Sequence, residues 1–207
     1  MSKTLLQINA SLFSRAGQST LLADAFVAAW QAANPGATVV RRDLAREPVP
    51  HLTAERFQAF LAKPEDHTPE QRAVDAYSMA LIDELERADV IVLGVPMYNF
   101  SVPSTLRAYF DHIARAGVTF QYTEQGPVGL LRNKNVYVFA TRGGIYAGTS
   151  KDTQTAYLRD FLALLGMTDV EFVYAEGLAI GEESKQQAVA GAHAAIEQLA
   201  APEKLAA

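Results

Sequence analysis

Apolar residues gather in short runs that alternate along the chain with longer stretches of helical spacing. The short runs are nearly continuous, which is typical of strands that are buried on both faces of a parallel sheet. They cover residues 4–9, 37–41, 90–95, 135–140 and 169–174. The helical stretches cover residues 21–30, 52–61, 68–87, 152–165 and 182–201, and another begins at Pro103. The pattern therefore predicts strands and helices in alternation.

This alternation predicts one α/β domain over residues 1–207, with a doubly wound, five-stranded parallel sheet and helices on both faces. We expect the flavodoxin-like strand order 2-1-3-4-5, in which the first and third strands are neighbours and a crevice opens at their carboxyl ends. Helix ends carry local signals as well. Thr68 and Gln71 form a predicted capping box, and Gly166 suits the residue after a helix.

The loop after the first predicted strand is small and rich in hydroxyl groups, and it leads directly into a helix. The start of a helix carries partial positive charge and unpaired N–H groups, so it suits a phosphate. An ordinary capped helix start is the alternative. Thr20 belongs to the same stretch, and the candidate phosphate ligands are Ser11, Gly17, Gln18 and Ser19.

Two further loops follow the third and fourth strands, at the same predicted edge of the sheet. The first offers aromatic faces and an amide, and the second offers paired glycines that let a planar ligand approach closely. Core packing and a simple turn are the respective alternatives. Phosphate at one end and a flat heteroaromatic ring at the other describe FMN. The candidate ring ligands are Met97, Tyr98, Asn99, Phe100, Thr141, Arg142, Gly143 and Gly144.

Composition narrows the function classes. The net charge of -5 argues against a broad nucleic-acid surface, so any phosphate must be held by backbone N–H groups and hydroxyls. The absence of cysteine excludes disulfides and thiolate chemistry, and we expect no metal site. Residues 4–8 already predict a strand instead of a signal peptide, and no apolar run approaches the roughly 20 residues of a membrane span. We expect a cytoplasmic protein with no membrane partner.

At these loops the sequence resembles the FMN-dependent NADH azoreductases, which are homodimeric members of the flavodoxin-like quinone reductase group. The resemblance runs from residue 3 to 181 and is most specific at residues 96–100, 114–122 and 141–144 and at Gln18-Ser19. It implies that the first loop holds the FMN phosphate and that the other two loops hold the isoalloxazine. Two positions depart from the family pattern. Thr141 stands where many relatives have a serine and keeps the hydroxyl, and Leu164 stands where some relatives have a phenylalanine in the wall of the substrate site, which bears on substrate preference.

The resemblance also implies an activity. NADH or NADPH would reduce FMN, and a quinone or azo compound would then take two electrons at the same place, in a ping-pong cycle. Cleavage of an azo compound to two aromatic amines would need this cycle twice. No protein residue is expected to act as a catalyst, since FMN carries the chemistry and no G-x-S-x-G or H-E-x-x-H motif occurs. A flavodoxin-type electron carrier without substrate turnover is the alternative function, and a flavin-free interaction module is a third.

Aromatic residues outside the three loops are candidates for the walls of a second substrate site. Phe120, Tyr122 and Tyr146 are the residues in question. The resemblance implies that the Phe120 segment reaches the flavin of a partner subunit, and packing inside its own core is the alternative. The aromatic segment 117–131 shows little regular pattern. On the helix after Pro103, we expect His112 to be solvated or packed, and Asp111 and Arg115 to form a surface pair.

Overall fold

The structure is a computed structural model that describes residues 2–200. Its centre is a parallel sheet in the order β2-β1-β3-β6-β7, which confirms the predicted topology, since β6 and β7 are the fourth and fifth strands of this sheet. The strands are β1 (Thr4–Asn9), β2 (Thr38–Asp43), β3 (Val90–Pro96), β6 (Asn135–Thr141) and β7 (Asp169–Ala175). Every residue of β3 is buried, as expected for the central strand.

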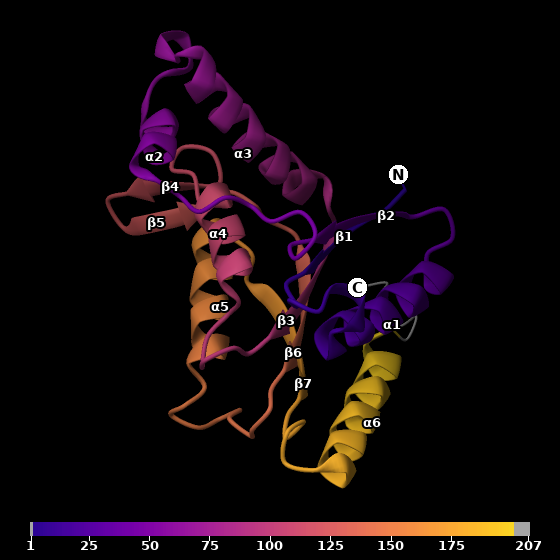
Figure 1. The fold of residues 1–207 in the computed structure, drawn as a ribbon. Helices are drawn as coiled ribbons and strands as arrows, with labels where there is room; N and C mark the ends of the chain where they lie inside the picture. Colours follow the sequence, from indigo (N-terminus) through magenta and orange to yellow (C-terminus); the bar gives the residue numbers. More distant parts are fainter. Residues whose placement is uncertain (1, 201–207) are drawn as a thin grey trace.

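Helices cover both faces of the sheet (Figure 1). Alternate side chains of each strand point to opposite faces, so Leu5 packs on the side of α1 and α6, and Leu6 packs on the side of α3, α4 and α5. The helices are α1 (Gln18–Ala33), α2 (Ala54–Leu61), α3 (Pro69–Arg87), α4 (Ser104–Ile113), α5 (Thr153–Leu165) and α6 (Glu182–Leu199). α2 and the start of α3 project beyond the sheet.

Several predicted helix ends are present. Thr68 and Gln71 exchange both hydrogen bonds of the capping box, at 3.3 and 3.0 Å. Gly166 ends α5 in the left-handed region, with φ of 99°. By contrast, α1 begins at Gln18, earlier than the predicted residue 21. The predicted final residue of the last helix, 201, lies outside the described residues.

Residues 117–131, where the sequence shows little regular pattern, do contain regular structure. β4 (Phe120–Thr123) and β5 (Gly126–Gly129) form an antiparallel hairpin. The hairpin rests on the end of α5, where a Cβ on Gly129 would lie 2.0 Å from the nitrogen of Gly166. Leu131 also donates its N–H to the carbonyl of Leu165, at 2.8 Å. Because these contacts join distant parts of the chain, the local pattern does not contain them.

The predicted surface pair of Asp111 and Arg115 is also wrong. Asp111 accepts from Arg107 at 3.3 Å, whereas Arg115 lies beyond the end of α4 and donates to Asp75 on α3 at 2.7 Å. His112, between them, is fully buried. Its Nδ1 bonds to the carbonyl of Ala108 at 2.9 Å, and burial lowers its pKa. The histidine is therefore part of the packing, which was one of the two expectations.

None of the helices in the described part of the chain has the length and apolar character that crossing a bilayer requires. Residues 2–200 also contain no group of three or more His, Asp or Glu side chains that is arranged to hold a metal ion.

Candidate functional site

The loops after β1, β3 and β6 meet at the carboxyl edge of the sheet. Met97 donates its N–H to the carbonyl of Thr141 at 2.8 Å, and the Tyr98 hydroxyl lies 3.4 Å from the nitrogen of Leu12. Between the loops lies a cavity of about 180 Å³. Its lining residues are Ser11, Phe13, Gly17, Gln18, Pro96, Met97, Tyr98, Thr141, Arg142, Gly143 and Leu178. The structure therefore brings residues from all three predicted loops together.

The first loop leaves the start of α1 open. Gly17 is its N-cap residue, and no side chain caps the helix, so the first N–H groups have no partner within the helix. The hydroxyl of Ser19 is fully buried and has no hydrogen-bond partner. A Cβ on Gly17 would lie 2.1 Å from Oγ of Ser11, which means that only glycine fits beside that hydroxyl. This end of the helix therefore has donors left for an anionic group.

The second loop is a tight turn. Tyr98 and Ser101 exchange two backbone hydrogen bonds of 3.0 Å, and Asn99 and Phe100 between them have φ of 51° and 63°. Such positive φ values cost energy in residues other than glycine, so the surrounding structure must hold the turn in place. The amide of Gln154 does so, because it donates to the carbonyls of Pro96 at 3.0 Å and Ser101 at 3.3 Å.

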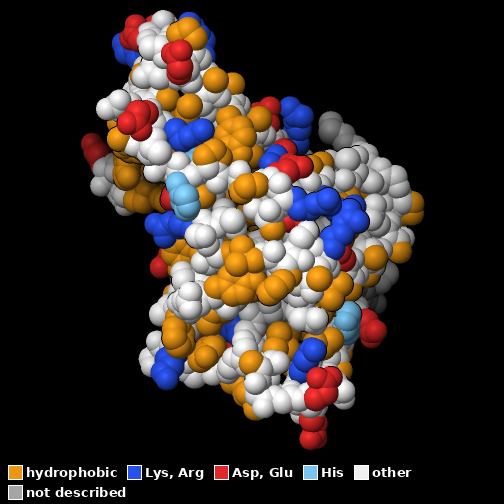
Figure 2. Space-filling model, viewed as in Figure 1, with side chains coloured by type: hydrophobic (Ala, Val, Ile, Leu, Met, Phe, Trp, Pro, Cys, Tyr) orange, Lys and Arg blue, Asp and Glu red, His pale blue; other side chains and the backbone are white. Residues whose placement is uncertain are grey.

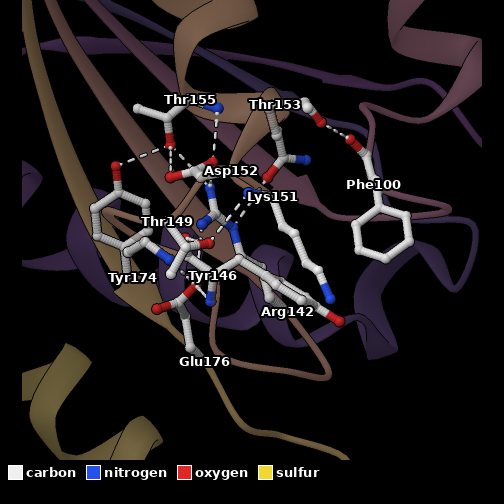
Figure 3. A network of polar contacts seen from close by, with 12 residues as sticks. Phe100, Arg142, Tyr146, Thr149, Lys151, Asp152, Thr153, Thr155, Tyr174 and Glu176 are labelled. Carbon is white, nitrogen blue, oxygen red and sulfur yellow. Dashed lines mark hydrogen bonds and ion pairs between the residues drawn. The ribbon is translucent and has the colours of Figure 1, made fainter.

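The third loop is organised by a buried arginine (Figure 3). The guanidinium of Arg142 is completely shielded from solvent. It donates to Asp152 at 2.8 Å, to Glu176 at 3.0 Å, to Thr155 at 2.9 Å and to Gln154 at 3.3 Å. Each of its three nitrogens therefore has a partner inside the protein, and the charged group is not available to a ligand in the cavity.

Two carboxylates complete this cluster. Glu176 accepts hydrogen bonds of 2.9 Å from the backbone N–H groups of Tyr146 and Ala147, which fixes the loop after β6. Burial raises the pKa of Asp152, but hydrogen bonds from Arg142 and Thr155 outweigh it, so the pKa is lowered overall. Asp152 is therefore a stable anion at neutral pH and a firm partner for the arginine.

A larger cavity of about 680 Å³ lies on the other side of the Tyr98 turn. Met97 and Tyr98 line both cavities, whereas Asn99 lines only the larger one. The remaining walls are Leu12, His51, Ser101, Val102, Pro103, Ser104 and Arg107. The two spaces therefore adjoin at one aromatic side chain, so a flat ligand in the smaller cavity would have room beside it.

Comparison with known proteins identifies the family. The Flavodoxin-like fold family matches residues 3–200. The FMN-dependent NADH:quinone oxidoreductase of Cellvibrio japonicus is 58% identical over 195 residues, which cover 94% of this chain and 97% of that protein. The protein of the same name from Alcanivorax borkumensis is 53% identical over 192 residues, with coverage of 93% and 97%. This chain belongs to the FMN-dependent NADH:quinone oxidoreductase family.

Solved structures agree with the family. An azoreductase from Bacillus anthracis str. Sterne superposes with a TM-score of 0.87 at 27% identity, over 96% of this chain and 98% of that one. An FMN-dependent NADH-azoreductase from Bacillus anthracis str. Ames Ancestor, in complex with FMN, has a TM-score of 0.84 at 26% identity, over 96% and 100%. The predicted family resemblance is thus confirmed.

The residues of this family member fit the two ends of FMN. The uncapped start of α1 and the unpartnered Ser19 hydroxyl suit a phosphate, and the cavity between the loops is lined by Met97 and Tyr98, which suit a ring. Of the predicted FMN ligands, Ser19, Asn99, Phe100 and Gly144 do not line the 180 Å³ cavity. Phe100 instead packs edge-on against Tyr146, with ring centroids 5.4 Å apart.

The three aromatic residues that were predicted to wall the second substrate site do not surround this cavity within a single chain. Phe120 is buried in the core, and Tyr122 is 76% exposed on the hairpin. Figure 1 shows the hairpin beside α4, far from the loop after β6. Tyr146 does lie close to the site, through its contact with Phe100.

Sequence reasoning missed Phe13, Pro96 and Leu178 in the cavity wall and the supporting roles of Gln154 and Glu176. Leu178 follows β7, so the rule that ligands bind at the carboxyl edge of the sheet contained a signal for it.

Proposed function

We propose that this protein is an FMN-dependent oxidoreductase that uses NADH to reduce quinones. The observation that carries the proposal is the cavity at the carboxyl edge, where an open helix start adjoins the loop of Met97 and Tyr98. Relatives that share more than half of its residues carry this activity in their names. Azo compounds, the substrates named for its structural neighbours, are a proposed second class of acceptor.

The chain's own residues would bind and orient the cofactor. Ser11, Gln18 and Ser19, with the free N–H groups of α1, would hold the phosphate. Met97 and Tyr98 would pack on the ring, while Thr141 and Gly143 frame its far edge. When bound, FMN supplies the hydride and electron transfer. The rigid second and third loops would keep the ring in one orientation, because Gln154, Arg142 and Glu176 fix their backbones.

The 680 Å³ cavity is the proposed place for the second reactant. It adjoins the flavin cavity at Met97 and Tyr98, and its other walls combine apolar residues such as Leu12 and Val102 with polar ones that include Arg107. A flat aromatic acceptor would pack on these walls, and its carbonyl oxygens would find polar groups in Asn99 and Ser104. NADH, which donates the electrons, and the aromatic compound that accepts them would occupy this cavity one after the other.

We further propose a homodimer, in which the hairpin of one subunit approaches the flavin site of the other. Tyr122 supports this arrangement, since the residue is 76% exposed although its ring packs edge-on against that of Phe120, with centroids 5.4 Å apart. Light scattering after size exclusion should give twice the mass of one chain. Tyr122→Ala should then raise the KM for quinones without unfolding the protein. Phe120→Ala is the poorer test, because Phe120 belongs to the core.

Steady-state turnover tests the proposed activity against the electron-carrier alternative. Purified protein is reconstituted with FMN and mixed with NADH or NADPH and a panel of quinones and azo dyes. An enzyme consumes the nicotinamide at a rate that depends on the acceptor, whereas a carrier without its own turnover does not. Protein that stays colourless and does not take up added FMN would contradict the proposal altogether. The same assay, run with each nicotinamide, decides between NADH and NADPH, and the cytoplasmic location stays a prediction.

A further inference from the structure

A second polar cavity lies behind the flavin loop, between α1 and the ends of β1 and β2. Its volume is about 490 Å³. Four arginines line it, together with Asn9, Thr20, Asp24, Asp43 and Glu47. The arginines are Arg15, Arg41, Arg42 and Arg46. Figure 2 shows Lys and Arg side chains gathered on the surface over β1 and β2. In a chain with a net charge of -5, such a concentration of arginine requires an explanation.

The carboxylates of this cavity already have partners or face solvent. Asp24 accepts from the amide of Gln7 at 2.6 Å. Asp43 accepts from the hydroxyl of Ser14 and from the N–H of Ala45. Glu47 is 77% exposed in its side chain and lies 3.9 Å from Arg42. Their charges remain, so the lining holds four arginines against three carboxylates, and none of the three forms an ion pair with Arg15, Arg41 or Arg46.

The arginines differ in what they contact. Arg42 forms a two-pronged ion pair with Glu84 on α3, with hydrogen bonds of 2.9 and 2.6 Å. Arg41 donates only to the neutral amide of Gln7, at 3.0 Å. The guanidinium groups of Arg15 and Arg46 make no hydrogen bond or ion pair with any of residues 2–200. Three exposed arginines at this cavity thus have no carboxylate of the described residues within ion-pair distance.

A second observation points to a ligand. Thr20 lines the same cavity and is 1% exposed, yet its hydroxyl has no hydrogen-bond partner among the described residues. A buried hydroxyl without a partner costs about 1–3 kcal/mol. The cavity therefore combines an unsatisfied buried hydroxyl with guanidinium groups, which form strong paired hydrogen bonds with phosphate oxygens.

We propose that this cavity is a second anion site, which binds a small molecule that carries a phosphate group. It is separate from the flavin cavity, because the two share no lining residue and the loop of residues 11–17 lies between them. Arg15, Arg41 and Arg46 hold the phosphate, and Thr20 lies at the buried wall. The volume accommodates an anion as large as a mononucleotide. The proposal does not rest on the oxidoreductase activity.

Calorimetry with FMN-saturated protein tests the proposal. Inorganic phosphate, pyrophosphate and adenosine 2′,5′-diphosphate are titrated separately, so that a free ion and a nucleotide are distinguished as sources of the phosphate. One anion should bind per chain, with the FMN already in place. Arg15→Ala and Arg46→Ala should each weaken binding about tenfold, as expected for the loss of a charge-assisted hydrogen bond. Thr20→Val should weaken it by a smaller factor.

Arg72→Ala is the matched control. Arg72 is exposed on α3 and does not line this cavity, so its replacement removes the same charge elsewhere. If Arg72→Ala weakened anion binding as much as Arg15→Ala and Arg46→Ala do, the effect would come from the overall charge of the protein, and the proposal would be overturned. Loss of binding on saturation with FMN would assign the anion to the flavin phosphate site and overturn it too, as would the absence of heat with all three anions at about 10 mM. The titration is repeated without FMN. A protein that fails to bind FMN can then still be tested for anion binding, so the two failures are distinguished.

Discussion

Two helices, α1 and α5, begin at the same edge of the sheet, and their first turns are built in opposite ways. At α1 no side chain caps the helix, and the hydroxyls of Ser19 and Thr20 are buried without partners. At α5 Asp152 caps the helix through Thr155 at 3.1 Å and also pairs with the buried Arg142. One helix start has no side-chain cap, and the other is capped by a carboxylate that the protein itself supplies.

The difference shows how one edge can both bind a ligand and remain rigid. Unsatisfied donors at α1 cost stability until an anion arrives, so they favour binding. The network at α5 contains buried charges, which are tolerated only because each has a partner. It therefore suits a support for the loops after β3 and β6, and not a binding surface. This comparison predicts that changes at α5 act on folding and that changes at α1 act on FMN binding.

The largest expected effect is that of Arg142→Met. It leaves Asp152 and Glu176 as buried carboxylates without a counter-charge, so the free energy of unfolding should fall by about 3–5 kcal/mol. Urea denaturation measures it, and Arg142→Lys should lose less because it keeps the charge. Arg72→Met on the exposed face of α3 is the control. A loss below about 1 kcal/mol for Arg142→Met would show that the network is not a support.

Gly17→Ala should have the next largest effect, on FMN affinity. The new Cβ would lie 2.1 Å from Oγ of Ser11, so the loop must shift away from the start of α1. We expect FMN to bind about thirtyfold more weakly, equivalent to about 2 kcal/mol. Quenching of flavin fluorescence measures the affinity. Gly191→Ala on α6, where a Cβ meets no atom within 4 Å, is the control and should bind normally. Equal affinity in both variants would contradict the proposed phosphate position.

Ser19→Ala should separate binding from stability more finely. It removes a buried hydroxyl that has no partner, so flavin-free protein should be as stable as before or more stable by up to about 1 kcal/mol. FMN affinity should fall about tenfold, because one hydrogen bond to the phosphate is lost. Thr155→Ala at α5 is the mirror experiment, and it should reduce stability. If Ser19→Ala lowered the stability and left the FMN affinity unchanged, the start of α1 would act as a support and not as a binding site, which would contradict the comparison.

The smallest expected effect is a pH dependence at α5. Hydrogen bonds from Arg142 and Thr155 outweigh the effect of burial and lower the pKa of Asp152 below its usual value of 3.8. The resulting stabilisation is present above the unfolded-state pKa and is lost as the pH falls through the folded-state pKa. Asp152→Asn should therefore flatten the acid limb of urea stability measured from neutral to acid pH. Asp160→Asn, an exposed position on the same helix, should leave the limb unchanged, and an identical limb in both variants would refute the assignment.

Local pattern was sufficient for the alternation of strands and helices and for the three loops. Apolar runs and helical spacing do not depend on the rest of the chain, and the rule that parallel strands present their carboxyl ends at one edge then placed Ser11, Tyr98 and Gly143 together. The capping box at Thr68 is likewise a matter of neighbouring residues. The order 2-1-3-4-5 came from the rules for doubly wound folds, and the sheet confirms it.

Only the tertiary structure decided which polar side chains face the cavity and which face the protein. Arg142 lies in a glycine-rich loop that the sequence assigned to the ligand, but its partners come from α5 and from beyond β7. Arg115 left its predicted partner for Asp75, which lies on another helix. Pairing of buried charges depends on distances between segments that are remote in sequence, and no local pattern encodes those distances. The sequence by itself determined where a site would form, and the packing of distant segments determined which groups are free to serve it.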